Sequence, residues 1–172
     1  MNHQLKKLTF MAMFIALSIV GAYIKVPSPT GTVAFDSMPA YLAALLLGGI
    51  PGGIIGFLGH MITSAYGGFP LTLPIHLFVA VEMAVTVIAY GWLTKRINLF
   101  IGIVVVSLLN GVGSPAVMAL IPGYGIGFFT AMVLPLLVGS IMNVVLSVIL
   151  YKALERSQVI QQMDVFTHDK SL

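Results

Sequence analysis

The side chains best suited to chemistry in this sequence are ionisable groups inside long apolar stretches. Glu82 lies about seven residues into the stretch that begins at Ile75. At about 1.5 Å per residue of helix, that is a depth of roughly 10 Å. His60 lies at a similar distance along the stretch that begins at Ile54. A bilayer strongly penalises ionisable groups at such a depth, so they predict a ligand-binding or gating site.

Two further ionisable groups stand at the ends of apolar stretches, where they could share a cavity with the first two. His76 begins the stretch that holds Glu82, and Asp36 directly precedes another. Structural roles remain open for two of the four candidates. Asp36 could be only the N-cap of the helix that starts at Ser37, and His60 could form only a hydrogen bond between helices. For Glu82 such a role is harder to accept, because an unpaired buried carboxylate costs several kcal/mol or takes up a proton.

Uncharged polar residues add weaker candidates for substrate binding. Asn110 stands beside the segment 111–115 and Ser114 within it, where glycine and proline are expected to kink or break a helix. A broken helix exposes backbone groups that only a cavity or buried protein can satisfy. Tyr66 falls at the predicted outer boundary, where it could stack on a ligand or serve as an interfacial anchor. Asn143 lies far along the last apolar stretch and is expected to be structural.

Motifs for several enzyme and metal chemistries are absent from the sequence. It contains no glycine-rich phosphate loop ending in Lys-Ser/Thr, no His-Glu-x-x-His and no Gly-x-Ser-x-Gly. His60, His76 and Glu82 could hold a metal ion if they converged, but their spacing matches no metal signature, and we expect neither a metal nor a cofactor. A membrane-embedded enzyme with Glu82 and His60 as an acid–base pair remains the alternative function, and a purely structural subunit is a third.

The composition places these candidates in a membrane protein. Hydrophobic residues make up 59% of the 172 residues and charged residues only 8%, whereas a soluble domain carries about 25% charged residues. The outer surface must therefore face lipid. The net charge of +3 is small, and the basic residues cluster at the ends of apolar segments. This pattern indicates membrane orientation rather than nucleic-acid binding.

The apolar stretches predict an all-α membrane protein with six transmembrane helices. The first stretch is as long as a span and has no clear cleavage site, so we read it as a retained helix rather than a signal peptide. A tight turn is expected at 48–53 and a kink or break in the fifth helix at 111–115, because glycine and proline interrupt regular structure. The predicted helices are Leu8–Lys25, Ser37–Leu47, Ile54–Tyr66, Ile75–Thr94, Leu99–Leu120 and Ile126–Leu154.

The basic residues predict that both termini are cytoplasmic. Seven of them then lie inside and only Lys25 outside, which is a clear positive-inside bias. The loops 26–36, 67–74 and 121–125 would lie on the outer face, where the first two would roof an outward-opening cavity. Residues 1–155 would form one membrane domain, and 156–172 a polar, disordered cytoplasmic tail. The cytoplasmic residues are Lys6, Lys7, Lys95, Arg96, Lys152, Arg156 and Lys170.

Small residues at four-residue spacing mark the first helix. Ala12 and Ala16 lie on one face, where a second backbone can approach closely. Together with six short helices and a long outer loop before a short second helix, this pattern resembles the S components of energy-coupling factor (ECF) transporters, over roughly residues 5–155. The resemblance implies a subunit that binds a vitamin or precursor from outside and works with a membrane T component and two ATPases. It also implies that Ala12 and Ala16 contact the T component.

Two loop regions, 28–39 and 68–76, look most like S components assigned to α-ribazole, a nucleoside precursor of cobalamin. Members for pantothenate and for hydroxymethylpyrimidine or another thiamine precursor are similar in size and pattern, so they remain alternatives. Cobalt and nickel members begin with Met-His. This chain begins Met1-Asn2-His3, and its N-terminus is predicted to be cytoplasmic, which disfavours a metal substrate.

Overall fold

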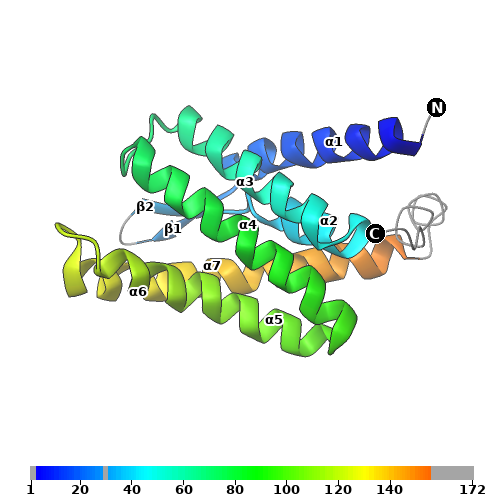
Figure 1. The fold of residues 1–172 in the computed structure, drawn as a ribbon. Coiled ribbons are helices and arrows are strands. Elements are labelled where there is room, and N and C mark those ends of the chain that lie inside the picture. Colours follow the sequence, from blue (N-terminus) through cyan, green and yellow to red (C-terminus); the bar gives the residue numbers. More distant parts are fainter. Residues whose placement is uncertain (1–2, 29–30, 156–172) are drawn as a thin grey trace.

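The computed structural model describes residues 3–28 and 31–155. This part of the chain folds into a helical bundle with one short β-hairpin (Figure 1). The predicted tail, 156–172, lies outside the described residues. The elements are α1 (His3–Tyr23), β1 (Lys25–Ser28), β2 (Gly31–Ala34), α2 (Met38–Leu47), α3 (Gly49–Tyr66), α4 (Leu73–Arg96), α5 (Leu99–Leu108), the π-helix η1 (Leu109–Gly113), α6 (Ser114–Ala119) and α7 (Gly125–Leu154).

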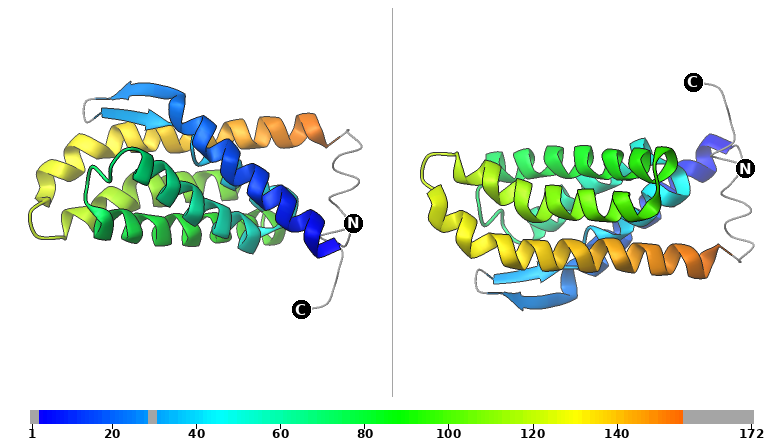
Figure 2. Two further views of the ribbon diagram at one scale, coloured as in Figure 1. Left: turned by 90° about the horizontal axis from the view of Figure 1, so that it is seen from above. Right: turned by 90° about the horizontal axis from the view of Figure 1, so that it is seen from below.

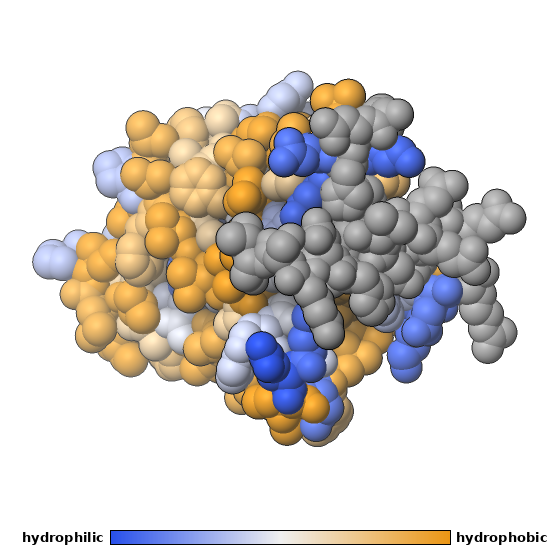
Figure 3. Space-filling view, turned by 45° about the vertical axis from the view of Figure 1, so that its right-hand side comes forward, coloured by the Kyte–Doolittle hydropathy of each residue, from blue (hydrophilic) through white to orange (hydrophobic). Residues whose placement is uncertain are grey.

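Four helical segments are long and apolar enough to cross a membrane. They are Gln4–Tyr23, Leu73–Arg96, Leu99–Ala119 and Gly125–Leu154. Large apolar side chains cover their outer faces, and hydrophobic residues cover the flank seen in Figure 3. Phe100 is 73% exposed and Val85 is 61% exposed. Because water would strongly disfavour so extensive an apolar surface, these faces must contact lipid.

Successive helices run in alternating directions along the bundle. The beginning of α1, the α4–α5 connection and the end of α7 lie at one end, and the α3–α4 and α6–α7 loops lie at the other (Figures 1 and 2). These two loops touch, because the Tyr124 hydroxyl donates to the Leu71 carbonyl over 3.5 Å. The predicted outer loops 67–74 and 121–125 therefore share one end of the molecule.

The predicted loop 26–36 contains an antiparallel hairpin that the sequence pattern did not indicate. β1 pairs with β2 from Lys25↔Ala34 to Ser28↔Gly31, and the hairpin lies beside α7 (Figure 2). After the hairpin, the chain crosses the end of α1, where the Phe35 amide donates to the Gly21 carbonyl over 3.1 Å. A Cβ atom on Gly21 would collide with the Phe35 carbonyl, so glycine permits this crossing.

The tight turn predicted at 48–53 is confirmed at Gly48 and is wrong for 51–53. α3 already begins at Gly49, and Gly48, with φ of 98°, alone separates it from α2. The glycines that follow serve close helix packing instead of a turn. A Cβ atom on Gly49 would lie 2.9 Å from the Ile88 carbonyl of α4, and one on Gly52 would lie 2.8 Å from the Ala44 Cα of α2. Such approach of backbones is what small residues provide in membranes.

The kink or break predicted in the fifth helix takes the form of a π-turn in a helix that stays continuous over Leu99–Ala119. The segment is divided into α5, η1 and α6, and η1 is a single wide turn that ends one residue before Ser114. Pro115 stands at the start of α6, where its missing N–H disturbs the preceding helical hydrogen bonds. Gly111 packs so tightly on Leu137 of α7 that a Cβ atom would collide with it.

The core of the bundle is built around the short helix α2. Ala40, Tyr41 and Ala43 have no exposed surface, and they pack with Val87 of α4 and Val144 of α7. Because α2 is enclosed by other helices, it does not need the length of a lipid-facing span.

Candidate functional site

A cavity of about 270 Å³ lies between α4, η1, α6, α7 and the connection that precedes α2; we call it the inner cavity. Its apolar wall contains Ala34, Leu71, Val79, Met83, Pro115, Met118, Phe128, Met132, Leu136 and Gly139. Its polar lining contains Asp36, Ser37, His60, His76, Asn110, Ser114, Ser140 and Asn143. Five of the seven predicted substrate-binding residues are in this set, although they come from four separate segments of the chain.

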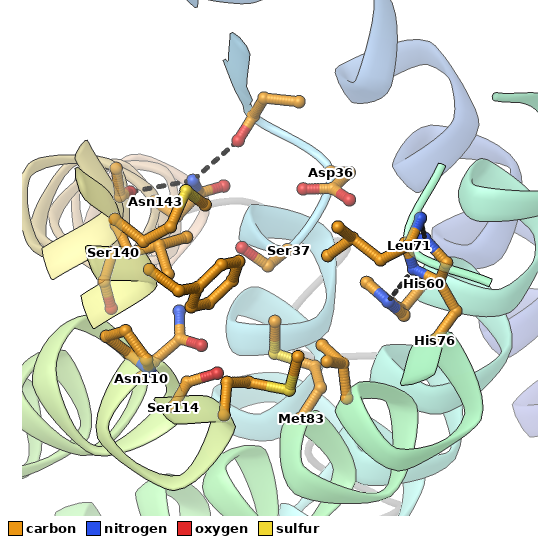
Figure 4. A pocket seen from close by; sticks show the side chains of 18 residues that line it. Asp36, Ser37, His60, Leu71, His76, Met83, Asn110, Ser114, Ser140 and Asn143 are labelled. Carbon is orange, nitrogen blue, oxygen red and sulfur yellow. Dashed lines mark hydrogen bonds between the residues drawn. The ribbon is translucent and has the colours of Figure 1, made fainter. Parts of the chain in front are cut away.

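The polar residues gather at two opposite sides of the inner cavity. Figure 4 shows Asn110, Ser114, Ser140 and Asn143 on one side and the two imidazole rings on the other, with Asp36 between them. The wide π-turn brings the Asn110 side chain and, one turn later, Ser114 to this cavity. A ligand with polar groups at both ends and an apolar middle would match this distribution.

Ser140 lies on the amide and hydroxyl side, where its hydroxyl oxygen interacts with the Tyr41 hydroxyl. The side chain is 2% exposed, and this oxygen is fully buried. Because this oxygen has almost no accessible surface, Ser140 shapes the cavity wall and does not present its hydroxyl to the cavity. Sequence reasoning missed it, because a serine in an apolar helix is common and gives no signal of its own.

Asn143 also has a structural role, as predicted. Its Oδ1 accepts the Met38 amide at 2.8 Å, and its Nδ2 donates to the carbonyls of Ala34 at 3.0 Å and Gly139 at 2.8 Å. Both amide hydrogens and one lone pair are thus used within the protein. Asn143 fixes β2 and the start of α2 against α7, and so shapes the cavity wall.

The two histidines meet on the other side. His76 Nδ1 lies 3.3 Å from His60 Nε2, and their ring centroids are 5.4 Å apart. His76 also accepts the Leu71 amide on Nε2 at 3.3 Å, and the Ser64 hydroxyl lies 3.2 Å from His60 Nε2. The interhelical hydrogen bond considered for His60 therefore exists, and it does not remove the residue from the cavity wall.

Asp36 is not the N-cap of α2, because the capping position is Ser37. The Asp36 carboxylate instead accepts the Thr63 hydroxyl of α3 at 3.3 Å. Burial raises the pKa of this carboxyl group, which lies in the connection between β2 and α2, to about 6. At neutral pH it is therefore mostly ionised and acts as an acceptor. Thr63, which holds it, was not among the predicted residues.

A second cavity of about 230 Å³, the side cavity, lies between α1 and α3. It shares Ala34, Asp36, His60 and His76 with the inner cavity, so these residues form the partition between the two. Tyr66 lines the side cavity and is 75% exposed; its ring packs edge-on against Tyr23 with centroids 6.2 Å apart. The structure thus separates Tyr66 from the inner cavity.

Glu82 lines neither of these two cavities. Its Oε2 is buried without a hydrogen-bond partner among the described residues, and its carboxyl group interacts with Ser114. Any effect of Glu82 on a ligand in the inner cavity would therefore act through Ser114. The possible metal site of His60, His76 and Glu82 does not form, since no group of three potential ligands converges within residues 3–28 and 31–155.

Ala12 and Ala16 both lie on the exposed side of α1. The opposite side of this helix is buried, with Phe14 at 3% and Ser18 at 1% exposure. The exposed alanines are surrounded by Met13 and other apolar side chains, so this face of α1 is open to lipid or to another protein.

A helical protein with several long apolar helices and a partly polar cavity between them can hold a small molecule within the membrane. The family model of the ECF transporter substrate-specific component matches residues 6–155, and the chain belongs to this family. Its fold is similar to a solved structure described as the S component of a bacterial ECF transporter, with a TM-score of 0.73 over 89% of this chain and 97% of that chain. The two sequences are 17% identical. A search of curated proteins gives no match.

The family assignment fixes the class of function. ECF S components bind substrates for transport in the membrane, together with a T component and ATPase subunits, and they are not enzymes. The membrane-embedded enzyme considered from the sequence is therefore wrong, and the prediction of a substrate-binding transport subunit is confirmed.

Proposed function

We propose that this S component captures α-ribazole from outside the cell and delivers it for uptake driven by a T component and two ATPases. The chain then crosses the membrane six times with both termini cytoplasmic, as the basic residues predict. The six spans are then the four long apolar helical segments, α3 and the short, buried α2. The ligand occupies the inner cavity, and Asp36, His60, His76, Asn110 and Ser114 contribute its polar contacts.

The observation that carries this proposal is the arrangement of the inner cavity. Hydroxyl and amide groups lie on one side, two imidazoles lie on the other, and Phe128 and several methionines line the wall between them. A nucleoside with an apolar bicyclic base suits such a site, because its ribose can hydrogen-bond at one end while its flat base packs on thioether and aromatic groups. The volume also suits a small ligand, near the low end of the usual range of about 300–1,000 Å³.

Charge further favours an uncharged ligand. Among the side chains that the structure describes, no lysine or arginine lines either cavity. Asp36 lies in the partition and is mostly ionised at neutral pH. A carboxylate ligand would be buried near this negative charge without a compensating cation, which is unfavourable in a low-dielectric site. This argument favours α-ribazole and hydroxymethylpyrimidine over pantothenate.

Calorimetric titration of the purified subunit in detergent tests the proposal. We expect α-ribazole to bind more tightly than hydroxymethylpyrimidine, and pantothenate to show no binding at the same concentrations. Asn110→Ala and Ser114→Ala should weaken α-ribazole binding by roughly ten- to a hundredfold, the effect of removing one buried hydrogen-bond partner. Thr130→Ala is the matched control, because this exposed threonine bonds only to the carbonyl of Gly127 in its own helix. Tighter binding of either rival compound would overturn the choice of substrate.

A further inference from the structure

A chain of hydrogen bonds connects the α3–α4 loop to the inner cavity through two histidines. The Leu71 amide donates to His76 Nε2 over 3.3 Å, and His76 Nδ1 lies 3.3 Å from His60 Nε2. Figure 4 shows both contacts as dashed lines. His60 in turn lines the inner cavity.

The first donor in this chain determines where every proton lies. A backbone N–H can only donate, so His76 Nε2 must be an unprotonated acceptor. A neutral His76 then carries its proton on Nδ1 and donates it to His60 Nε2. His60 Nε2 must also be unprotonated, and it accepts the Ser64 hydroxyl as well. A neutral His60 therefore carries its proton on Nδ1.

This assignment leaves His60 with one N–H that the protein does not use. Among the described residues, Nδ1 of His60 has no hydrogen-bond partner, and it is not one of the fully buried unpartnered atoms. His60 lies in the partition between the inner and the side cavity, and we take this N–H to face the inner cavity. If His60 carried its proton on Nε2, two N–H groups would face each other, either between His60 and His76 or, if His76 also changed tautomer, between His76 and the Leu71 amide. The other hydrogen bonds therefore keep His60 Nδ1 protonated, as a donor.

We propose that His60 is a specificity-determining residue, whose Nδ1–H selects a substrate with an unprotonated acceptor at the matching position. An aromatic ring nitrogen or a carbonyl oxygen satisfies this requirement, and a ring C–H or N–H does not. The inference rests on the proposed function, since the free imidazole nitrogen of α-ribazole is such an acceptor. His76 acts as a positioning residue, because it touches His60 and orders its proton.

The proton assignment can be tested without any ligand. We expect ¹⁵N-histidine spectra of the micelle-bound protein at neutral pH to show both His60 and His76 as Nδ1–H tautomers, assigned with the single variants His60→Asn and His76→Asn. An Nε2–H tautomer at either residue would overturn the proposal, whatever the substrate proves to be.

The role in recognition is tested with two substitutions that each keep half of the imidazole. Asn places an amide N–H near the position of Nδ1, whereas Gln places its amide oxygen near the position of Nε2. We expect His60→Asn to bind α-ribazole roughly ten- to a hundredfold more tightly than His60→Gln, because only Asn keeps a donor near the position of Nδ1. Equal affinities of the two variants, or tighter binding by His60→Gln, would contradict the proposal.

Changing the ligand atom that His60 is proposed to contact completes a double-mutant cycle between protein and ligand. In a riboside of 5,6-dimethylindole, a C–H replaces the free ring nitrogen of α-ribazole. Wild type should bind this compound roughly ten- to a hundredfold more weakly than α-ribazole, and His60→Gln should bind the two compounds equally. An unchanged preference in His60→Gln would show that His60 does not read this atom. If wild type binds neither compound, the substrate proposal fails, and the tautomer spectra still decide the state of His60.

Discussion

Asn143 in α7 accepts a hydrogen bond from the backbone N–H of Met38, the first residue of α2, which lies 105 positions earlier in the chain. The distance from Met38 N to Asn143 Oδ1 is 2.8 Å. The same side chain donates to the Ala34 carbonyl at the end of β2. One amide thus fixes both ends of the connection that contains Asp36. The position of Asp36 in the inner cavity depends on this contact between distant segments.

Replacing Asn143 should loosen that connection. We expect Asn143→Ala to lower the free energy of unfolding by about 2 kcal/mol or more, because three hydrogen bonds are lost and buried backbone groups are left unpaired. Unfolding in detergent, followed by circular dichroism, measures this. Thr130→Ala in the same helix removes one exposed hydrogen bond and should have little effect. Similar stability of the two variants would mean that the Asn143 contacts contribute little.

Some of this site is readable from the sequence, for a physical reason. The cost of burying polar groups in lipid marks Asp36, His60, His76 and Asn110 as candidates, and all four line the inner cavity. The irregularity of the fifth helix also follows from local residues, since Pro115 acts on its own helix wherever that helix lies. These inferences need only the depth or the local backbone of a residue.

Other features depend on which helices are neighbours, and spacing does not supply this. Met83 lines the inner cavity, whereas Glu82, one residue earlier, does not. Adjacent residues differ by about 100° around a helix, so their roles depend on which direction faces the cavity. The glycines at the start of α3 were predicted to form a turn, again because spacing does not show which helices lie beside them. Their role is to pack against α2 and α4, which only the assembled bundle reveals.

The exposed alanines of α1 lead to a prediction about assembly. We expect Ala16→Trp to abolish uptake in cells that hold the complete transporter, because a bulky side chain would separate two backbones that must approach closely. The purified variant should still bind α-ribazole like wild type, since Ala16 lies outside both cavities. Val85→Trp on the exposed face of α4 is the control and should support uptake. Normal uptake by Ala16→Trp would contradict a partner contact at this position.

The proposed topology can be tested with single cysteines, because the sequence contains none. Thr72 lies in the α3–α4 loop and Ile97 at the opposite end of α4, and both are exposed. We expect an impermeant maleimide added to intact cells to label Thr72→Cys, and to label Ile97→Cys only after permeabilisation. The reverse pattern would invert the protein in the membrane and place the α3–α4 loop in the cytoplasm.

Glu82 gives a prediction in which stability and binding should respond differently. Its Oε2 is buried without a hydrogen-bond partner among the described residues, and the side chain lines neither cavity. Glu82→Gln keeps the shape and removes the uncompensated charge, so we expect the free energy of unfolding to rise by about 1 kcal/mol. The Kd for α-ribazole should stay within about threefold of wild type, a change of under about 0.7 kcal/mol.

Asp36→Asn is the matched comparison for Glu82→Gln, because it makes the same chemical change at a carboxylate that does line the inner cavity. It should weaken α-ribazole binding by about tenfold or more, since a charged acceptor is lost. Calorimetric titration gives both Kd values, and unfolding in detergent gives both stabilities. A tenfold loss of affinity in Glu82→Gln together with unchanged binding in Asp36→Asn would reverse the assignment. The substrate would then contact the carboxylate of α4 rather than the one that Thr63 holds before α2.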